Sequence, residues 1–316
     1  MAFDTTQPGQ IVGLGEYEYD PIFTVGETIE GYAPPGILDG IGAFELDENT
    51  VRVLANHEFS SAVGYAYELA NGTQLQGARV SYFDINKETF EIEDAGLAYD
   101  TIINRQGEIV DDPTDLEFEG LNRFCSSIYI EPQQFGDGIG LEDGIYFTGE
   151  ESSQGTEFAL DPSSNTLYAA PWMGRAAWEN VTELNTGSTE KVSILVGDDR
   201  EAAPLLMYVG DKDRSEGAGF LERNGLVGGK VYACVPDGEV GDTPEFVNED
   251  GEVIDADTAP DPFGFNGTGN SLSGSWVELD HYRPDLASED GSTGYDADGF
   301  ATQEQQDAMF IEAGGF

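Results

Sequence analysis

Glycine and proline divide this chain into short segments. Of its 316 residues, 41 are Gly and 14 are Pro, and the apolar runs between them end in Gly, Asn or Asp. Short apolar runs separated by turn residues are typical of strands, and they favour a sandwich, a barrel or a propeller over a helical fold. The predicted strands are residues 50–55, 78–84, 89–93, 144–148, 165–170, 205–209 and 230–235.

Helices are predicted at only two places. Residues 302–312 form one candidate, because Thr302 can cap the first turn together with Gln305. Residues 198–206 form the other, although Pro204 interrupts the pattern. The predicted fold therefore has few and short helices.

Two stretches rich in glycine and acidic residues, about 236–275 and 285–299, are predicted to be long loops. Such loops are either simply solvated or ordered by bound cations. We expect residues 1–316 to form a single mainly β domain, a sandwich, barrel or propeller, with these two stretches as insertions.

The charge of the chain is strongly one-sided: 62 acidic and 13 basic residues give a formal net charge of −49. Binding to nucleic acid or to an anionic membrane surface needs clustered Lys and Arg, so neither is expected. Because 39% of the residues are hydrophobic and 11% aromatic, the chain can build a core and is not expected to be disordered. The acidic excess suits bound divalent cations, or a high-salt or extracellular setting.

Targeting signals and cross-links give little information. No apolar run approaches the roughly 20 residues that cross a bilayer as a helix, so no membrane insertion is expected. Residues 1–5 have neither the basic nor the apolar region of a signal peptide. The two cysteines, Cys125 and Cys234, can form one bridge, and their spacing does not decide whether they do.

Acidic residues follow several predicted strands. Strand ends gather near the axis of a propeller, so carboxylates from distant parts of the chain should meet there, which is unfavourable without cations between them. The set that we expect to meet is Glu150, Glu151, Glu179 and Asp211. The segments concerned are Asn56-His57-Glu58, Gly149-Glu150-Glu151, Trp178-Glu179-Asn180 and Gly210-Asp211-Lys212-Asp213.

Each of these features also has an ordinary structural explanation. A Glu-Glu pair after a strand is often a solvated turn, His57 can lie in a capped turn, and Cys125 can be a small buried residue. Oxygen ligands suit Ca²⁺ or Mg²⁺, and a thiolate or imidazole extends the range to iron, manganese or zinc. The chain has no Gly-x-Ser-x-Gly elbow, P-loop or His-Glu-x-x-His, whereas a Ser-His-Asp triad built on His57 or His281 stays open.

Taken in order, several motifs between residues 50 and 236 resemble those of the PhoX-type alkaline phosphatases and their uncharacterised relatives. The resemblance is carried by Leu54-Ala55-Asn56-His57-Glu58-Phe59, Leu121-Asn122-Arg123-Phe124-Cys125, Glu150-Glu151, Gly174-Arg175-Ala176-Ala177-Trp178-Glu179, Tyr208-Val209-Gly210-Asp211-Lys212-Asp213 and Gly229-Lys230-Val231-Tyr232. It implies a β-propeller with a buried calcium–iron cluster that hydrolyses phosphate monoesters outside the cytoplasm. It also leads us to expect the last part of that fold, including an Arg-Pro-Glu segment, beyond Phe316.

The same resemblance assigns roles to individual residues. Cys125 is expected to bind iron as Fe³⁺, while His57 and Glu58 line or brace the site. Arg123, Arg175 and Lys212 lie next to the expected ligands in sequence and can orient a substrate phosphate, or can simply pair with carboxylates. The expected metal ligands, for Ca²⁺ as well as iron, are Glu150 or Glu151, Glu179 and Asp211, with Glu58 and His57 as further candidates.

Two functions fit the sequence. The first is metal-dependent hydrolysis of a small phosphate ester in an extracellular or periplasmic setting. The second is a calcium-stabilised extracellular structural or surface-layer protein, in which calcium bridges acidic loops within or between subunits and the phosphatase site is degenerate or incomplete. Iron together with calcium in the purified protein would favour the hydrolase, and calcium alone would favour self-assembly.

Overall fold

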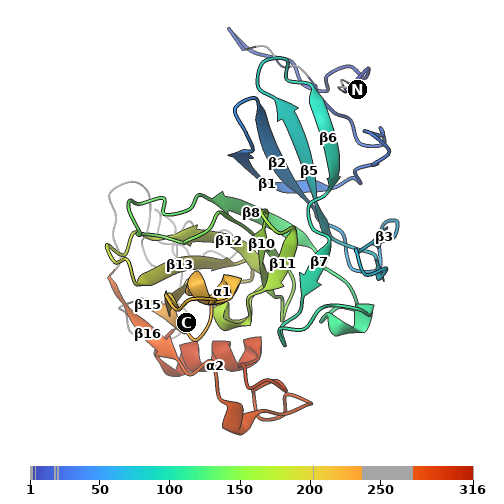
Figure 1. Ribbon diagram of the computed structural model, residues 1–316. Coiled ribbons are helices and arrows are strands. Elements are labelled where there is room, and N and C mark those ends of the chain that lie inside the picture. Colours follow the sequence, from blue (N-terminus) through green and yellow to red (C-terminus); the bar gives the residue numbers. More distant parts are fainter. Residues whose placement is uncertain are drawn as a thin grey trace, which may run out of the picture.

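The computed structural model describes residues 3, 5–17, 19, 21–201, 203–236 and 273–315. The described part is mainly β, with three sheets of four or five strands that follow one another along the chain (Figure 1). It contains only two α-helices, α1 (Phe220–Arg223) and α2 (Gln303–Glu312). The predicted class, mainly β with few short helices, is confirmed.

Each sheet is assembled largely from strands that are neighbours in sequence and run antiparallel. The first contains, in spatial order, β1 (Leu38–Glu45), β2 (Thr50–His57), β5 (Arg79–Asn86) and β6 (Ile92–Leu97). The second contains β7 (Thr101–Ile103), β11 (Thr166–Ala169), β10 (Glu157–Asp161), β9 (Ile145–Glu150) and β8 (Phe124–Ile130). The third contains β12 (Trp178–Glu183), β13 (Lys191–Asp198), β14 (Leu206–Asp211), β15 (Lys230–Pro236) and β16 (Gly274–Leu279).

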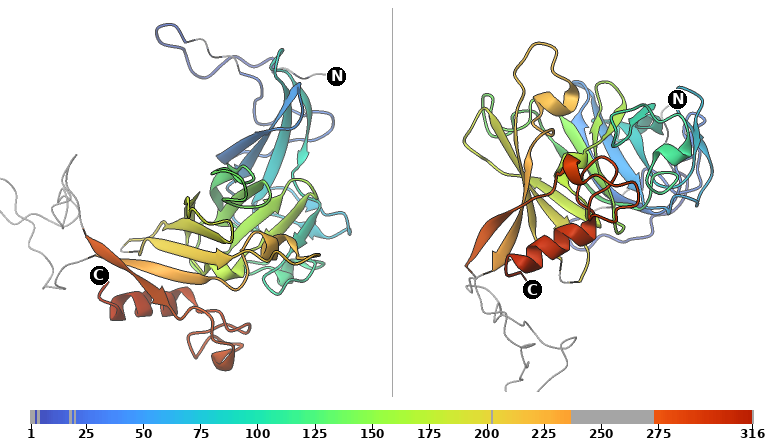
Figure 2. Two further views of the ribbon diagram at one scale, coloured as in Figure 1. Left: turned by 60° about the vertical axis from the view of Figure 1, so that its left-hand side comes forward. Right: turned by 90° about the horizontal axis from the view of Figure 1, so that it is seen from below.

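Shorter elements connect the sheets. A two-stranded hairpin, β3 (Tyr67–Glu68) and β4 (Gln74–Leu75), lies between β2 and β5. Three 3₁₀ turns in the described residues are η1 (Pro113–Asp115), η2 (Pro171–Met173) and η4 (Pro284–Leu286). Helix α2 packs against β16 on the outer side of the third sheet (Figure 2).

The three sheets meet through their edge strands. β8, at the edge of the second sheet, packs against β1 of the first sheet and against β12 of the third, without ladder hydrogen bonds across either contact. Among the described residues the sheets do not close into a ring. Side chains from all three sheets can therefore meet where β1, β8 and β12 pack together.

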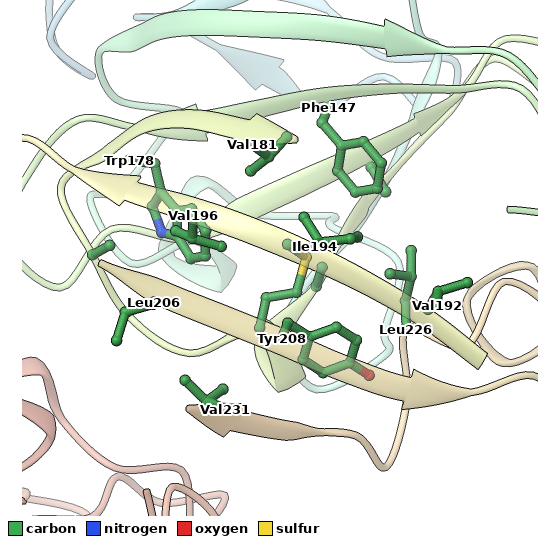
Figure 3. Packing of buried hydrophobic residues seen from close by; sticks show 14 of the residues in the cluster. Phe147, Trp178, Val181, Val192, Ile194, Val196, Leu206, Tyr208, Leu226 and Val231 are labelled. Atoms are coloured by element: carbon green, nitrogen blue, oxygen red, sulfur yellow. The ribbon is translucent and has the colours of Figure 1, made fainter. Parts of the chain in front are cut away.

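Alternation along the strands builds the core between the second and third sheets. Val192, Ile194 and Val196 of β13 are buried on one face, and Tyr208 of β14 is fully buried beside them (Figure 3). Trp178 is 1% exposed and donates its indole N–H to the carbonyl of Gly155 at 3.0 Å. Burying a side chain of this size contributes about 1.5–3 kcal/mol, so this packing fixes the position of β12.

The predicted strands correspond to real ones, with one shift. Residues 50–55, 78–84, 144–148, 165–170, 205–209 and 230–235 fall on β2, β5, β9, β11, β14 and β15. The predicted run 89–93 begins too early, because Phe90 has a φ of 61° in the turn and β6 starts only at Ile92. Strands β1, β8, β10, β12, β13 and β16, and the short strands β3, β4 and β7, were not predicted.

One predicted helix is confirmed and the other is wrong. Thr302 caps α2 by accepting a hydrogen bond from the backbone N–H of Gln305. The stretch 198–206 is not helical: β13 ends at Asp198, β14 begins at Leu206, and strand pairing on both sides overrides the weak helical pattern.

The two predicted loops differ in how much of them is described. Residues 285–299 are irregular apart from the end of η4, as predicted. Of the stretch 236–275, β16 already occupies residues 274 and 275, and 237–272 lie outside the described residues. Cys125 and Cys234 are both free thiols, so the bridge that their presence allows is not formed.

Candidate metal centre

The edge strands β1, β8 and β12 share a local design at the place where they meet. In each strand the second residue carries a side chain that can bind a metal, namely Asp39, Cys125 and Glu179. The pairing of each edge strand with its neighbour is irregular here, between Leu38/Ile41, Phe124/Ser127 and Trp178/Val181. A bulge of this kind releases residues from the ladder and re-aims their side chains, so each sheet presents one ligand at the junction.

A second acidic residue stands beside the start of each edge strand. Glu58 follows β2, Glu151 follows β9 and Asp199 follows β13, the strands that run toward the junction. Each makes the same backbone hydrogen bond to the residue just before the edge strand, at 2.9 Å to Ile37, 2.9 Å to Arg123 and 2.8 Å to Ala177. The three sheets therefore repeat one arrangement of two ligand positions.

Four of these carboxylates, Asp39, Glu58, Glu151 and Glu179, gather around Cys125. One ligand atom each from Asp39, Glu58 and Cys125 lies within 4.8 Å of the others, and the same holds for Cys125, Glu151 and Glu179. The thiol of Cys125 donates to Glu179 Oε2 at 3.3 Å. Cys125 thus joins two groups of carboxylates that come from all three sheets. Asp39 is exposed and the other four are half-buried, so solvent reaches the cluster.

Arg123 is the positive group at this cluster. Its Nη2 lies 2.7 Å from Glu58 Oε1 and 2.6 Å from Glu151 Oε2, so one guanidinium holds a carboxylate from each of two sheets. Its side chain is still 41% exposed. With four carboxylates and one guanidinium, the cluster has a formal side-chain charge of −3 when the thiol is neutral.

Burial, together with the neighbouring charges, alters the acidity of two groups at the cluster. Burial raises the pKa of the Cys125 thiol, and its hydrogen bond to Glu179 raises it further. Burial also raises the pKa of Glu58, with a contribution from the charge of Glu151. A bound cation reverses this tendency, because it stabilises thiolate and carboxylate. The donor set of four carboxylates and one thiol therefore fits metal ions.

Backbone strain marks the residues before β1 and β8. Ile37 has a φ of 51° and Arg123 a φ of 46°, in the left-handed region that side chains other than glycine rarely adopt. The carbonyl oxygens of Ile37 and Arg123 accept hydrogen bonds from the backbone N–H groups of Glu58 and Glu151, respectively. Strained residues of this kind cluster at functional sites, where the surrounding structure enforces them.

Glu150 and Glu151 are neighbours that have different environments. Consecutive residues in extended backbone point to opposite faces, so only Glu151 reaches the cluster. Glu150 is 2% exposed, and its carboxyl group accepts from the N–H groups of Asn122 at 3.1 Å and Thr156 at 3.2 Å. Burial raises the pKa of Glu150 to about 8. The prediction that Glu150 shares the cluster is wrong, and the residue braces two loops.

His57 is buried away from the cluster. Its Nε2 lies 2.6 Å from Ser81 Oγ and its Nδ1 3.1 Å from the carbonyl of Gly36. Burial lowers the pKa of His57 to about 4, so the ring is neutral. Ser81 is fully buried and no described carboxylate contacts the ring, so His57 and Ser81 do not form a hydrolytic triad. His57 braces the segment that leads into β1.

Asp211 lies at the other end of the third sheet. It is paired across the ladder with Lys191, whereas Trp178, next to Glu179, is paired with Asp198 at the opposite end of β13. These ends are about 23 Å apart at roughly 3.3 Å per residue. The side chain of Asp211 is 73% exposed and forms an ion pair with Lys191 at 2.5 Å. The prediction that Asp211 meets Glu179 is therefore wrong.

The other two basic residues proposed from the sequence also lie elsewhere. Arg175 is 5% exposed and its guanidinium contacts Glu117 and Asp296. Lys212 is buried and lies 2.8 Å from Glu142. Of the three candidates for contacting a phosphate, only Arg123 is at the cluster.

The sequence analysis missed Asp39. It lies in a strand that was not predicted, and no motif marks it. The available signal is repetition: Leu38-Asp39-Gly40, Phe124-Cys125-Ser126 and Trp178-Glu179-Asn180 each place a metal-binding side chain between an apolar residue and a small or polar one.

Comparison with known proteins gives one structural match. Neither a protein-family model nor a curated protein matches the sequence. Among solved structures, the chain is similar to Pseudomonas fluorescens PhoX in complex with vanadate, a transition state analogue, with 15% identity and a TM-score of 0.43. The match covers 66% of this chain and 47% of that chain, so this chain spans about half the length of the structure that it matches. Separately, no described helix is both long and apolar enough to cross a membrane.

Proposed function

We propose that the junction of the three sheets is a metal centre and that the protein is a metal-dependent phosphoester hydrolase. The observation that carries the proposal is Cys125, whose thiol belongs to two groups of carboxylates at once. The side chains that would hold the metals are Cys125, Glu151, Glu179, Asp39 and Glu58. The carboxylates suit Ca²⁺, and the thiolate adds affinity for Fe³⁺.

The proposal includes the architecture and the setting. The three sheets would be consecutive blades of a β-propeller, with β1, β8 and β12 as the strands nearest its axis. Residues 1–316 would then belong to one domain of that type. An extracellular or periplasmic setting fits the acidic composition and the supply of calcium that such a centre needs.

Phosphate esters are the substrate class that this cluster suits once it is loaded. Bound metal ions would supply the positive charge that binds phosphoryl oxygens and offsets the charge developing on them. Arg123 contacts the carboxylates of Glu58 and Glu151 through Nη2 and the carbonyl of Glu151 through Nε, which leaves Nη1, and its side chain is 41% exposed. Its guanidinium can therefore also donate hydrogen bonds to a phosphoryl oxygen beside the cluster.

The test combines metal analysis with an assay on p-nitrophenyl phosphate. We expect the purified protein to contain calcium and iron and to hydrolyse the ester, and Glu179→Gln to lose both metal and activity. Asp211→Asn is the matched control, because it removes a carboxylate of the same sheet at the other end, and it should keep both. Hydrolysis by metal-free protein, or equal metal content in the two variants, would contradict the proposal.

A calcium-stabilised structural protein is the second candidate, and the net charge of −49 favours it. In that case calcium would bridge acidic surfaces within or between copies of the chain. Calcium without iron, no ester hydrolysis, and assembly that reverses with chelator would together support this function over the hydrolase.

A further inference from the structure

A cavity of about 380 Å³ lies on the other side of the β9 end from the metal-binding cluster. Its walls come from the segment 104–108 after β7, from η1 and the residues that follow it, from Glu150 and Phe158 of the second sheet, and from Thr156 just before β10. The residues proposed as metal ligands do not line it. The cavity is therefore a separate feature of the second sheet.

In the inner part of the cavity, two described side chains carry hydrogen-bond donors that have no acceptor. Arg105 has a side chain only 8% exposed, and its Nε and Nη1 have no hydrogen-bond partner among the described residues. The hydroxyl group of Thr156, 1% exposed, likewise has no partner there. Buried polar groups are almost always hydrogen-bonded, so these donors are suited to an acceptor that enters the cavity.

The charge of Arg105 is also poorly compensated. Its Nη2 lies 3.5 Å from Asp296 Oδ2, and Arg175 contacts the same oxygen atom at 3.2 Å. Arg175 has Glu117 as a second ion-pair partner at 3.1 Å, whereas Arg105 makes no second ion pair among the described residues and has Glu117 and Asp298 only as more distant carboxylates. A buried cation is costly unless it is paired, so an anionic group beside Arg105 would be stabilising.

The mouth of the cavity has the opposite character. Glu108 and Glu117 lie there with their side chains toward solvent. The carboxylate of Glu108 has no partner among the described residues, and that of Glu117 is 40% exposed. A simple anion such as phosphate would pass these carboxylates to reach Arg105, whereas a ligand with a cationic end would be attracted by them.

We propose that this cavity binds a small zwitterion of the amino-acid type, with its carboxylate at Arg105 and Thr156 and its ammonium group at Glu108. One end supplies the acceptor that the buried donors lack, and the other pairs with the free carboxylate at the mouth. Phe158, Leu116 and Ala169 provide apolar wall for the ligand's side chain. The inference is independent of the metal centre, since it uses none of its residues.

The test measures binding to the full chain. Thermal shifts with each of the standard amino acids identify the one that stabilises the protein most, and calorimetry then compares it with its 2-hydroxy acid and its amide. We expect each analogue to bind at least about tenfold more weakly, because each lacks one of the two charged ends. Inorganic phosphate serves as a simple anion for comparison.

Two variants connect the binding to the cavity. Arg105→Met should abolish binding of the amino acid, whereas Arg52→Met, which removes a half-buried arginine of the first sheet, should not change it. Glu108→Gln, at an exposed position, should weaken binding of the amino acid and leave binding of its hydroxy acid unchanged. No shift with any amino acid, tighter binding of phosphate than of any amino acid, or equal loss of both ligands in Glu108→Gln would overturn the proposal.

Discussion

The two ends of the third sheet carry similar acidic motifs and have different surroundings. At one end, Glu179 lies in the junction with Cys125 and Glu151 from the second sheet. At the other end, Asp211 is exposed and contacts only Lys191 of the neighbouring strand within the described residues. Both residues stand beside a strand terminus, so their sequence context alone does not separate them.

Strand direction explains the difference. In each sheet the strand paired with the edge strand at the junction, namely β2, β9 or β13, runs toward the junction, and the residue after it lies beside the start of the edge strand. β14 is antiparallel to β13 and so runs away from the junction, which carries Asp211 to the far end. An acidic residue after a strand is therefore informative about a shared centre only when the direction of that strand is known.

The largest expected effect is at the junction itself. Cys125→Ser should weaken iron binding by at least about 100-fold, since even residues that only support a metal ligand cost 10–100-fold when changed. Metal analysis after dialysis measures this. Cys234→Ser, in β15 of the third sheet, is the control and should keep its metal. If both variants retain iron equally, Cys125 is a packing residue, and the junction end of the third sheet does not differ from the far end in metal binding.

Removing calcium should destabilise the protein because the cation is lost from the junction end of the third sheet and not from its far end. A ligand that binds only the folded state stabilises it by about 2.7 kcal/mol at a hundredfold excess over its Kd. We expect chelator to lower the melting temperature of the wild type and of Asp211→Asn by the same amount, at equal ionic strength. Glu179→Gln should show a smaller decrease. Identical melts with calcium and with chelator would contradict the account.

Glu157 gives a pH-dependent test at the junction end of the second sheet, where it is paired with Gly149. Burial raises the pKa of Glu157 well above its ordinary value of 4.5. The folded protein then keeps a proton that the unfolded chain releases, so this group's contribution to stability is lost as the pH rises above about 4.5 toward the raised pKa.

The variant Glu157→Gln does not titrate, so its melting temperature relative to the wild type should increase with pH. Melting curves across this range measure the difference. Glu48→Gln, at an exposed position between β1 and β2, should show no such trend. A constant difference for Glu157→Gln would mean that the carboxyl group is solvated.

The smallest effect is expected at the far end. Removing the exposed ion pair by Asp211→Asn should change the free energy of unfolding by no more than about 0.5 kcal/mol, because exposed pairs contribute little. Denaturant titration measures it. A loss of several kcal/mol would show that this end is structurally more important than its exposure indicates.

The sequence predicts the fold class better than the site. Turn residues and apolar runs predicted the mainly β class and seven of the strands, because local chemistry determines both. The strands β8 and β12 were missed since their bulges interrupt the alternation at Cys125 and Glu179. The signal for a strand was weakest where the candidate ligands lie.

The membership of the cluster depends on tertiary structure. Cys125, Glu151, Glu179 and Glu58 were proposed from the sequence, and the fold brings them together. Asp39 could not be selected among 62 acidic residues before the repeated arrangement of the sheets was known. Which of Glu150 and Glu151 faces the cluster likewise depends on where β9 ends, and the Glu-Glu pair in the sequence does not show it.

The most direct test is anomalous X-ray diffraction from crystals grown with calcium and iron. The account predicts an iron peak bonded to Cys125 Sγ, and calcium within about 2.3–2.6 Å of carboxylate oxygens of the same cluster. The far end of the third sheet, at Asp211, should show no peak. Metal bound only at Asp211 or in exposed loops, with none beside Cys125, would contradict the claim that the junction of the three sheets is a metal centre.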